Sequence, residues 1–178
     1  LMAGILIVND DFVQFFLGQD FQDARYAIAI MIFRMFFIGW TNIMGIQILI
    51  PHNRNKEFMI STTAPAIISV GLNLLFLPKL GYIGAAIVSV LTEALVWAIQ
   101  LYFTRRYLKE VPIIGSMTKI ILASAIMYGI LLGSKTVIHF SPTLNVLVFA
   151  VLGGIIYLFA ILSLKVVDVK ELKQIIKK

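Results

Sequence analysis

The sequence predicts an all-α integral membrane protein, a multi-span helical bundle, and three observations support this. The first is composition: of 178 residues, 60% are hydrophobic and 13% are charged, and the mean hydropathy is +0.96. A soluble domain carries about 25% charged residues, so this chain has too little polar surface to cover a globule in water. The other two observations are apolar runs of membrane-spanning length and the placement of basic residues between them.

The apolar runs divide the chain into spans. Crossing the hydrocarbon core takes roughly 20 mainly apolar residues, and five runs approach that length: 26–50, 59–77, 81–103, about 117–138 and 144–164. The fourth contains Lys119 and Lys135, whose long side chains we expect to reach the headgroups. Residues 1–8 predict the remnant of an earlier span, ended by Asn9, Asp10 and Asp11, and residues 9–25 an external segment.

We therefore expect three regions: a lobe over residues 1–110, two terminal transmembrane helices over 111–164 and a basic cytoplasmic tail over 165–178. The chain opens inside an apolar run with Leu1, and no basic segment precedes that run as it would in a signal peptide. We interpret the chain as a C-terminal fragment of a longer membrane protein.

The basic residues predict the orientation. Five spans in series alternate between the two sides of the membrane, so each connection is assigned a side before any charge is counted. Three basic residues then lie on one side (Arg25, Lys79 and Lys135), and eleven lie on the other: Arg54, Lys56, Arg105, Arg106, Lys109, Lys119, Lys165, Lys170, Lys173, Lys177 and Lys178. Cytoplasmic loops carry the excess of Lys and Arg. We therefore expect the turn after Pro51, which ends the first full span, and the C-terminus to be cytoplasmic.

Residue types that carry catalysis are scarce. There is no cysteine, so neither a disulfide nor a thiolate metal site is expected. His52 and His139 fall in loops on opposite sides of the membrane and cannot share a metal. No phosphate-binding glycine loop, zinc spacing or nucleophile elbow is present, so we expect no enzyme, no metal and no cofactor. The net charge of +6 is explained by membrane topology rather than by binding of nucleic acid.

Two charged residues inside the spans are the main site candidates. Arg34 lies about eight residues, near 12 Å, from the outer end of its helix, and Glu93 lies about twelve residues into its own span. The depths differ by about 6 Å, which an arginine side chain can bridge. Intramembrane charges usually face a protein interior or a watery cavity. The pair is interpreted either as lining a cavity or as an ion pair that only holds two helices together.

Three uncharged polar residues within the spans, Asn42, Gln47 and Asn73, are weaker candidates for a substrate cavity. Side chains of this type more often form hydrogen bonds between helices, each contributing on average about 0.6 kcal/mol. Small residues at Gly81, Gly84 and Ala85 are expected to let a neighbouring helix come close.

Two stretches, GIQILIPHNRNKEF and NLLFLPKLGYIGAAIVSVLTE, together resemble the C-terminal region of Wzx-like polysaccharide and oligosaccharide-lipid flippases. These belong to the multidrug/oligosaccharidyl-lipid/polysaccharide exporter superfamily. The matching residues are Gly45, Gln47, Leu49, Ile50, Pro51, Phe58, Asn73, Leu77, Pro78, Gly81, Gly84, Ala85, Ala86 and Glu93. The resemblance covers residues 1–110; the last two spans agree only in hydropathy.

The resemblance implies the second lobe of a MATE-like exporter in the bacterial plasma membrane, working by alternating access together with an N-terminal lobe that this sequence lacks. The implied cargo is an undecaprenyl-pyrophosphate-linked oligosaccharide, for capsule, exopolysaccharide or O-antigen assembly. Arg34 is then a candidate partner for pyrophosphate or acidic sugars, and Glu93 a candidate site for a coupling proton or sodium ion. Membrane lipids, a polysaccharide polymerase and glycosyltransferases are the expected partners.

Three alternatives remain at this stage. One is another exporter of the same superfamily, either a lipid II flippase or a cation-coupled drug antiporter. Another is a membrane-embedded enzyme of polysaccharide assembly, such as an acyltransferase or polymerase, which would need a catalytic His or Asp. The last is an anchor without transport activity, for which charges at the depth of Arg34 and Glu93 would be unnecessary.

Overall fold

The computed structural model describes residues 2–108, 113–137 and 141–164, and it is all-α, as the composition predicts. The helices are α1 (Met2–Phe16), α2 (Ala24–Thr41), α3 (Asn55–Leu108), α4 (Ile113–Val137) and α5 (Pro142–Ser163). A short 3-10 helix, η1 (Gln19–Phe21), precedes α2, and a π-helix, η2 (Asn42–Leu49), continues it. Within the described residues, four helices are long and apolar enough to cross a membrane. The expected tail over 165–178 lies outside the described residues, as do Lys109 and His139.

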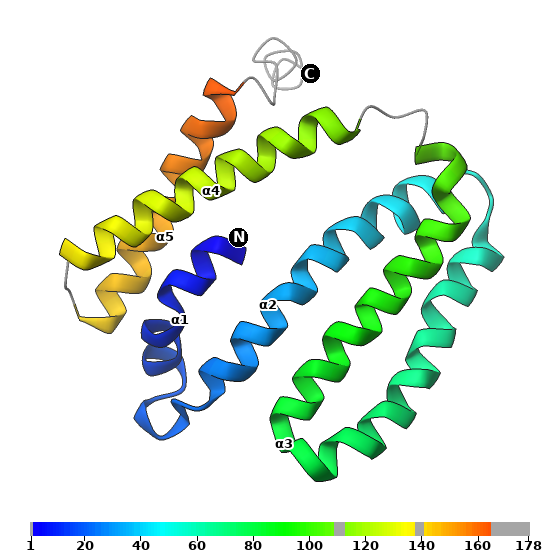
Figure 1. Ribbon diagram of the computed structural model, residues 1–178, viewed down its shortest axis with the longest axis horizontal. Coiled ribbons are helices and arrows are strands. Elements are labelled where there is room, and N and C mark those ends of the chain that lie inside the picture. Colours follow the sequence, from blue (N-terminus) through cyan, green and yellow to red (C-terminus); the bar gives the residue numbers. More distant parts are fainter. Residues whose placement is uncertain (1, 109–112, 138–140, 165–178) are drawn as a thin grey trace. The chain divides into compact units, whose positions relative to one another are not determined.

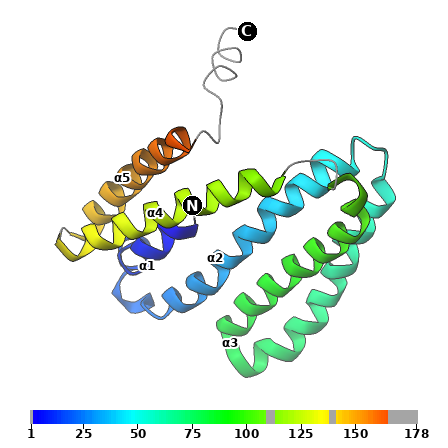
Figure 2. The same cartoon turned by 45° about the horizontal axis from the view of Figure 1, so that its top comes forward.

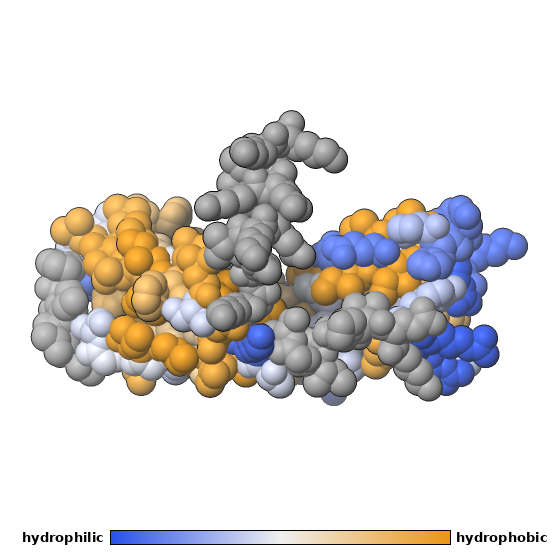
Figure 3. Space-filling model, turned by 90° about the horizontal axis from the view of Figure 1, so that it is seen from above, coloured by the Kyte–Doolittle hydropathy of each residue, from blue (hydrophilic) through white to orange (hydrophobic). Residues whose placement is uncertain are grey.

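The helices form two compact units, one of α1, α4 and α5 and the other of α2, η2 and α3 (Figures 1 and 2). Large apolar side chains are exposed on both, including Leu74 and Phe159, each at 73%. Hydrophobic residues accordingly cover much of the surface seen in Figure 3. Because a surface of this kind is stable in lipid and not in water, the protein is a membrane protein.

The unit of α1, α4 and α5 is built on an apolar core with a polar cluster beside it. The core contains Ile7, Val8, Met127, Leu131 and Phe149. The first helix was expected to end at Asn9-Asp10-Asp11. Instead, α1 continues to Phe16.

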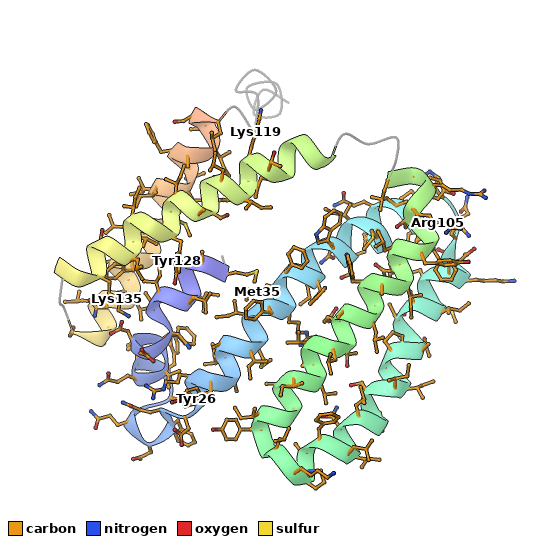
Figure 4. All side chains as sticks on the ribbon, viewed as in Figure 1. Tyr26, Met35, Arg105, Lys119, Tyr128 and Lys135 are labelled. Carbon is orange, nitrogen blue, oxygen red and sulfur yellow. The ribbon has the colours of Figure 1, made fainter. Side chains whose placement is uncertain are left out.

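The polar cluster explains why the helix continues. Lys135 Nζ lies 3.3 Å from Asp11 Oδ2, and Asn145 Nδ2 donates to Asp11 Oδ1 at 3.1 Å. Lys135 also donates to the Ile7 carbonyl, and Figure 4 labels it near the end of α4. With partners from α4 and α5, the Asp11 carboxylate can remain in a half-buried position that would otherwise be costly. Lys135 is thus bound to protein groups, whereas the sequence predicted that its side chain would reach the headgroups.

α3 is one continuous element of 54 residues that reverses its direction at Gly81. A straight helix of that length would extend about 81 Å, far beyond a hydrocarbon core of about 30 Å. Gly81 has φ 55° and ψ −138°, a combination that glycine adopts readily and other residues do not. Residues 55–80 and 82–108 therefore form two arms that lie side by side in Figure 1.

Small residues allow the two arms to approach each other just after the reversal. Gly84 is buried, and a Cβ placed there would lie 2.7 Å from the Phe76 carbonyl oxygen. Ala86 and Val88 are also buried. Of the small residues predicted from the sequence to allow close packing, Gly84 does so next to the turn, whereas Gly81 is exposed and serves the reversal.

α2 runs parallel to the second arm of α3. Three contacts join the two helices, and the residues in each are 59 or 60 positions apart: Tyr82 with Asp23, Arg34 with Glu93, and Phe37 with Trp97. A constant separation along both helices requires that they point in the same direction. Consecutive spans alternate in direction, so this is the arrangement expected for two helices separated by one antiparallel arm.

The connection between α2 and α3 begins with the π-helix and ends at Arg54. The Ile50 N–H donates to the Gly45 carbonyl five residues earlier, at 3.1 Å, and Pro51 has no N–H with which to continue the helix. Asn53 takes a positive φ of 58°, which asparagine tolerates better than most residues. The helix therefore ends where the proline predicts.

Arg54 fixes the start of α3 to the second arm. Its Nη2 donates to Glu57 Oε1 at 2.8 Å, and its Nη1 donates to the Phe103 carbonyl at 3.2 Å. The pKa of Glu57 is lowered, first by a hydrogen bond from its own backbone N–H and then by the Arg54 guanidinium. The hydrogen bond to Phe103 thus joins the two arms at this end, and the ion pair with Glu57, within the first arm, orients the guanidinium that makes it.

The backbone at Gly81 yields a test of the reversal. We expect Gly81→Ala to lower the free energy of unfolding by about 1–3 kcal/mol, the cost of a strained backbone conformation. The measurement is denaturant titration of the full-length protein in mixed micelles. Gly71→Ala is the matched control, because a Cβ meets nothing within 4 Å at either position and only Gly81 has a positive φ. Equal effects of the two substitutions would contradict the account.

Candidate functional site

The central feature of the α2–α3 unit is an ion pair between its two parallel helices. Arg34 Nη2 and Nε donate to Glu93 Oε1 at 2.9 and 3.2 Å. The side chains are 38% and 18% exposed. Both donors bind Oε1, so Oε2 keeps its lone pairs for another donor. The two intramembrane charges that stand out in the sequence are thus brought together.

The ion pair is energetically required by its surroundings. A single charge at mid-membrane costs at least about 2.5–3.5 kcal/mol. An opposite charge in contact with it offsets part of this cost. One turn further along, the rings of Phe37 and Trp97 are in contact with centroids 5.9 Å apart. This contact continues the parallel alignment of α2 with the second arm of α3.

A polar cavity lies on the same helices, beyond the ion pair. Its volume is about 330 Å³, which is within the range of ligand pockets. α2, η2 and both arms of α3 line it with Thr41, Asn42, Ile46, Phe58, Thr62, Thr92, Glu93, Val96 and Gln100. Six of these nine side chains are polar, in a unit whose other surfaces are mainly apolar. Polar groups in such surroundings usually mark a binding site or a path.

Gln100 is the most deeply buried of the polar residues that line this cavity. It is 1% exposed, and its Nε2 donates to Ser61 Oγ on the first arm at 3.3 Å. Its Oε1 is buried and accepts no hydrogen bond from the part of the chain that the structure describes. An unsatisfied buried acceptor costs about 1–3 kcal/mol, so a hydrogen-bond donor that reaches this oxygen would be stabilised.

Gly45 makes room for the Gln100 side chain. A Cβ at this position of η2 would lie 2.9 Å from Gln100 Nε2 and 2.7 Å from the Phe58 ring. Any other residue would therefore displace the groups that form this end of the cavity. The π-helix places Gly45 at the contact, and single-turn departures from α-helix of this kind are frequent at functional sites.

The sequence-predicted candidates fall into two groups. Arg34 and Glu93 form the ion pair, and Glu93 and Asn42 line the cavity. Gln47 is exposed on η2, and Asn73 donates to the Ser69 carbonyl of its own helix at 2.9 Å. Neither Gln47 nor Asn73 is among the described residues that line the cavity.

Sequence reasoning missed Gln100 and the cavity threonines Thr41, Thr62 and Thr92. A signal for Gln100 was present, because it follows Glu93 by seven residues, two helical turns, and so lies on the same face. The threonines gave no signal, since a threonine in a membrane helix commonly bonds to its own backbone. Among the described residues, no three His, Cys, Asp or Glu side chains gather as metal ligands.

The ion pair can be tested by a double-mutant cycle on Arg34→Met and Glu93→Gln, with the free energy of unfolding measured in mixed micelles. We expect a coupling of about 0.5–3 kcal/mol, toward the lower end because Arg34 is 38% exposed. Each single variant leaves a polar or charged partner without its ion pair, so the double variant should be less destabilised than the sum. The control cycle pairs Glu93→Gln with Arg105→Met, at the far end of α3. Coupling as small as in the control would contradict the account.

Comparison with known proteins gives one relative and no family or structural match. Residues of this chain are 32% identical over 93 positions to a protein of Escherichia coli (strain K12) named "Putative O-antigen transporter". The match covers 52% of this chain and 22% of the length of that protein. No family model matches the chain, and no solved structure matches it.

Proposed function

We propose that this chain is part of a transporter that moves undecaprenyl-pyrophosphate-linked oligosaccharide across the bacterial plasma membrane by alternating access. The transported unit would serve the assembly of capsule, exopolysaccharide or O-antigen. The observation that carries the proposal is the similarity, over 93 residues, to the protein named "Putative O-antigen transporter". A polar cavity inside a mainly apolar helical unit agrees with it.

The orientation follows from charge. Eleven basic residues are assigned to the side of the α2–α3 turn and three to the opposite side. By the positive-inside rule, this asymmetry supports a cytoplasmic turn and a cytoplasmic C-terminus. Arg105, labelled near the end of α3 in Figure 4, is one of the eleven. Cargo would then enter from the side at which the cavity residues Thr41 and Gln100 lie.

Arg34 and Glu93 take different roles in this proposal. A guanidinium offers paired donors to a phosphate group, so Arg34 is the candidate partner of the pyrophosphate. In the present structure its Nε and Nη2 are bound to Glu93, and phosphate binding therefore requires that Arg34 release this carboxylate. Released Glu93 would be free to take up a proton or sodium ion, which would couple ion movement to transport.

Deletion of the gene in its own host tests the proposal. We expect surface polysaccharide to fall at least tenfold and lipid-linked oligosaccharide to accumulate in the membrane fraction, because synthesis continues without transport. A plasmid-borne wild-type gene should restore export, and Arg34→Ala at equal protein level should not restore it fully. Surface polysaccharide that is unchanged by the deletion would overturn the proposed function. Full export by the Arg34→Ala variant would remove only Arg34 from the transport path.

A further inference from the structure

The hydroxyl groups that line the cavity of the α2–α3 unit each donate a hydrogen bond to a backbone carbonyl. Thr41 Oγ1 donates to the Ile38 carbonyl at 3.1 Å, and Thr92 Oγ1 donates to the Val88 carbonyl at 2.7 Å. Thr62 Oγ1 is 3.1 Å from the carbonyls of Phe58 and Met59. A hydroxyl has one proton to donate and two lone pairs. These three side chains can therefore offer a ligand only hydrogen-bond acceptors.

Each of the two amides of the cavity has two N–H groups, one bound within the protein and one left. Asn42 Nδ2 donates to the Ile38 carbonyl at 2.9 Å, and Gln100 Nε2 donates to Ser61 Oγ at 3.3 Å. Their carbonyl oxygens remain as acceptors, and Gln100 Oε1 is buried without a hydrogen-bond partner among the described residues. The cavity therefore favours a ligand that donates several hydrogen bonds.

The charge of the cavity selects among such ligands. Glu93 is its single lining residue with a charge, within the described chain, and Arg34 neutralises that charge from the neighbouring helix. While this ion pair is intact, a cation gains little from the neutralised carboxylate, and the oxygens of a phosphate would meet mainly acceptors, with one N–H on each amide as the exceptions. Neutral groups with several hydroxyls remain, and sugar residues are of this class.

We infer that this cavity binds the sugar hydroxyls of the transported oligosaccharide and that Gln100 is a specificity-determining residue within it. The inference rests on the proposed function and deepens it by dividing the cargo between two places. The lipid-linked phosphate belongs with Arg34, and the neutral sugars belong with Gln100 and the threonines. A hydroxyl suits Gln100 in either orientation of the amide, because it both donates and accepts.

Binding of two lipid probes to the full-length protein in nanodiscs tests the inference. One probe is the undecaprenyl-pyrophosphate-linked oligosaccharide extracted from the deletion strain, and the other is undecaprenyl phosphate, which has no sugar. We expect Gln100→Leu to raise the Kd for the oligosaccharide probe about tenfold and to leave the Kd for undecaprenyl phosphate within about twofold. Gln47→Leu is the matched control, since Gln47 is exposed on η2, and it should change neither Kd.

The possible outcomes separate the two proposals. If wild-type protein binds both probes and Gln100→Leu changes neither Kd, or raises both equally, the inference is overturned and the proposed function stands. If wild-type protein binds neither probe, the proposed function fails and the inference fails with it. If Gln100→Leu does not fold, Thr92→Val replaces it, because this substitution removes an acceptor from the cavity at nearly constant volume. A selective rise in Kd for the sugar-bearing probe supports the inference.

Discussion

The ion pair between Arg34 and Glu93 is the interaction on which the α2–α3 unit depends. Each charge alone would be costly in a membrane, so the two helices that carry them must lie together at this depth. The pairing fixes the register of α2 against the second arm of α3, and the Phe37–Trp97 contact follows one turn later. It also neutralises Glu93, so that the neighbouring cavity is polar without a net charge. One interaction thus sets both the packing and the chemistry of the site.

Glycine positions make this arrangement sterically feasible. Gly81 allows the backbone to reverse between the two arms, Gly84 lets the arms approach, and Gly45 leaves space for Gln100. The threonine hydroxyls of the cavity donate to backbone carbonyls, and each amide donates one of its two N–H groups within the protein. More acceptors than donors therefore remain for a ligand. A wall of acceptors is a consequence of membrane-helix chemistry that a hydroxyl-rich ligand can use.

Much of this unit could be predicted from the sequence, and the reasons are physical. Long apolar runs predict spans, Pro51 predicts a helix end, and the similar depths of Arg34 and Glu93 predict their contact. Gln100 was not predicted, because its role depends on Gly45 and Ser61, which reach it only through tertiary packing. Asp11 was expected to end a helix; it stays inside α1 because Lys135 and Asn145 bind it from α4 and α5.

The distance between the Arg34 guanidinium nitrogens and the Glu93 carboxyl carbon tests the central claim most directly. It can be measured by ¹⁵N–¹³C dipolar recoupling in solid-state NMR on the selectively labelled full-length protein in lipid bilayers. The account predicts a distance of about 4 Å or less, as expected for a salt bridge. A distance greater than about 6 Å, beyond the reach of a direct charge interaction, would contradict it.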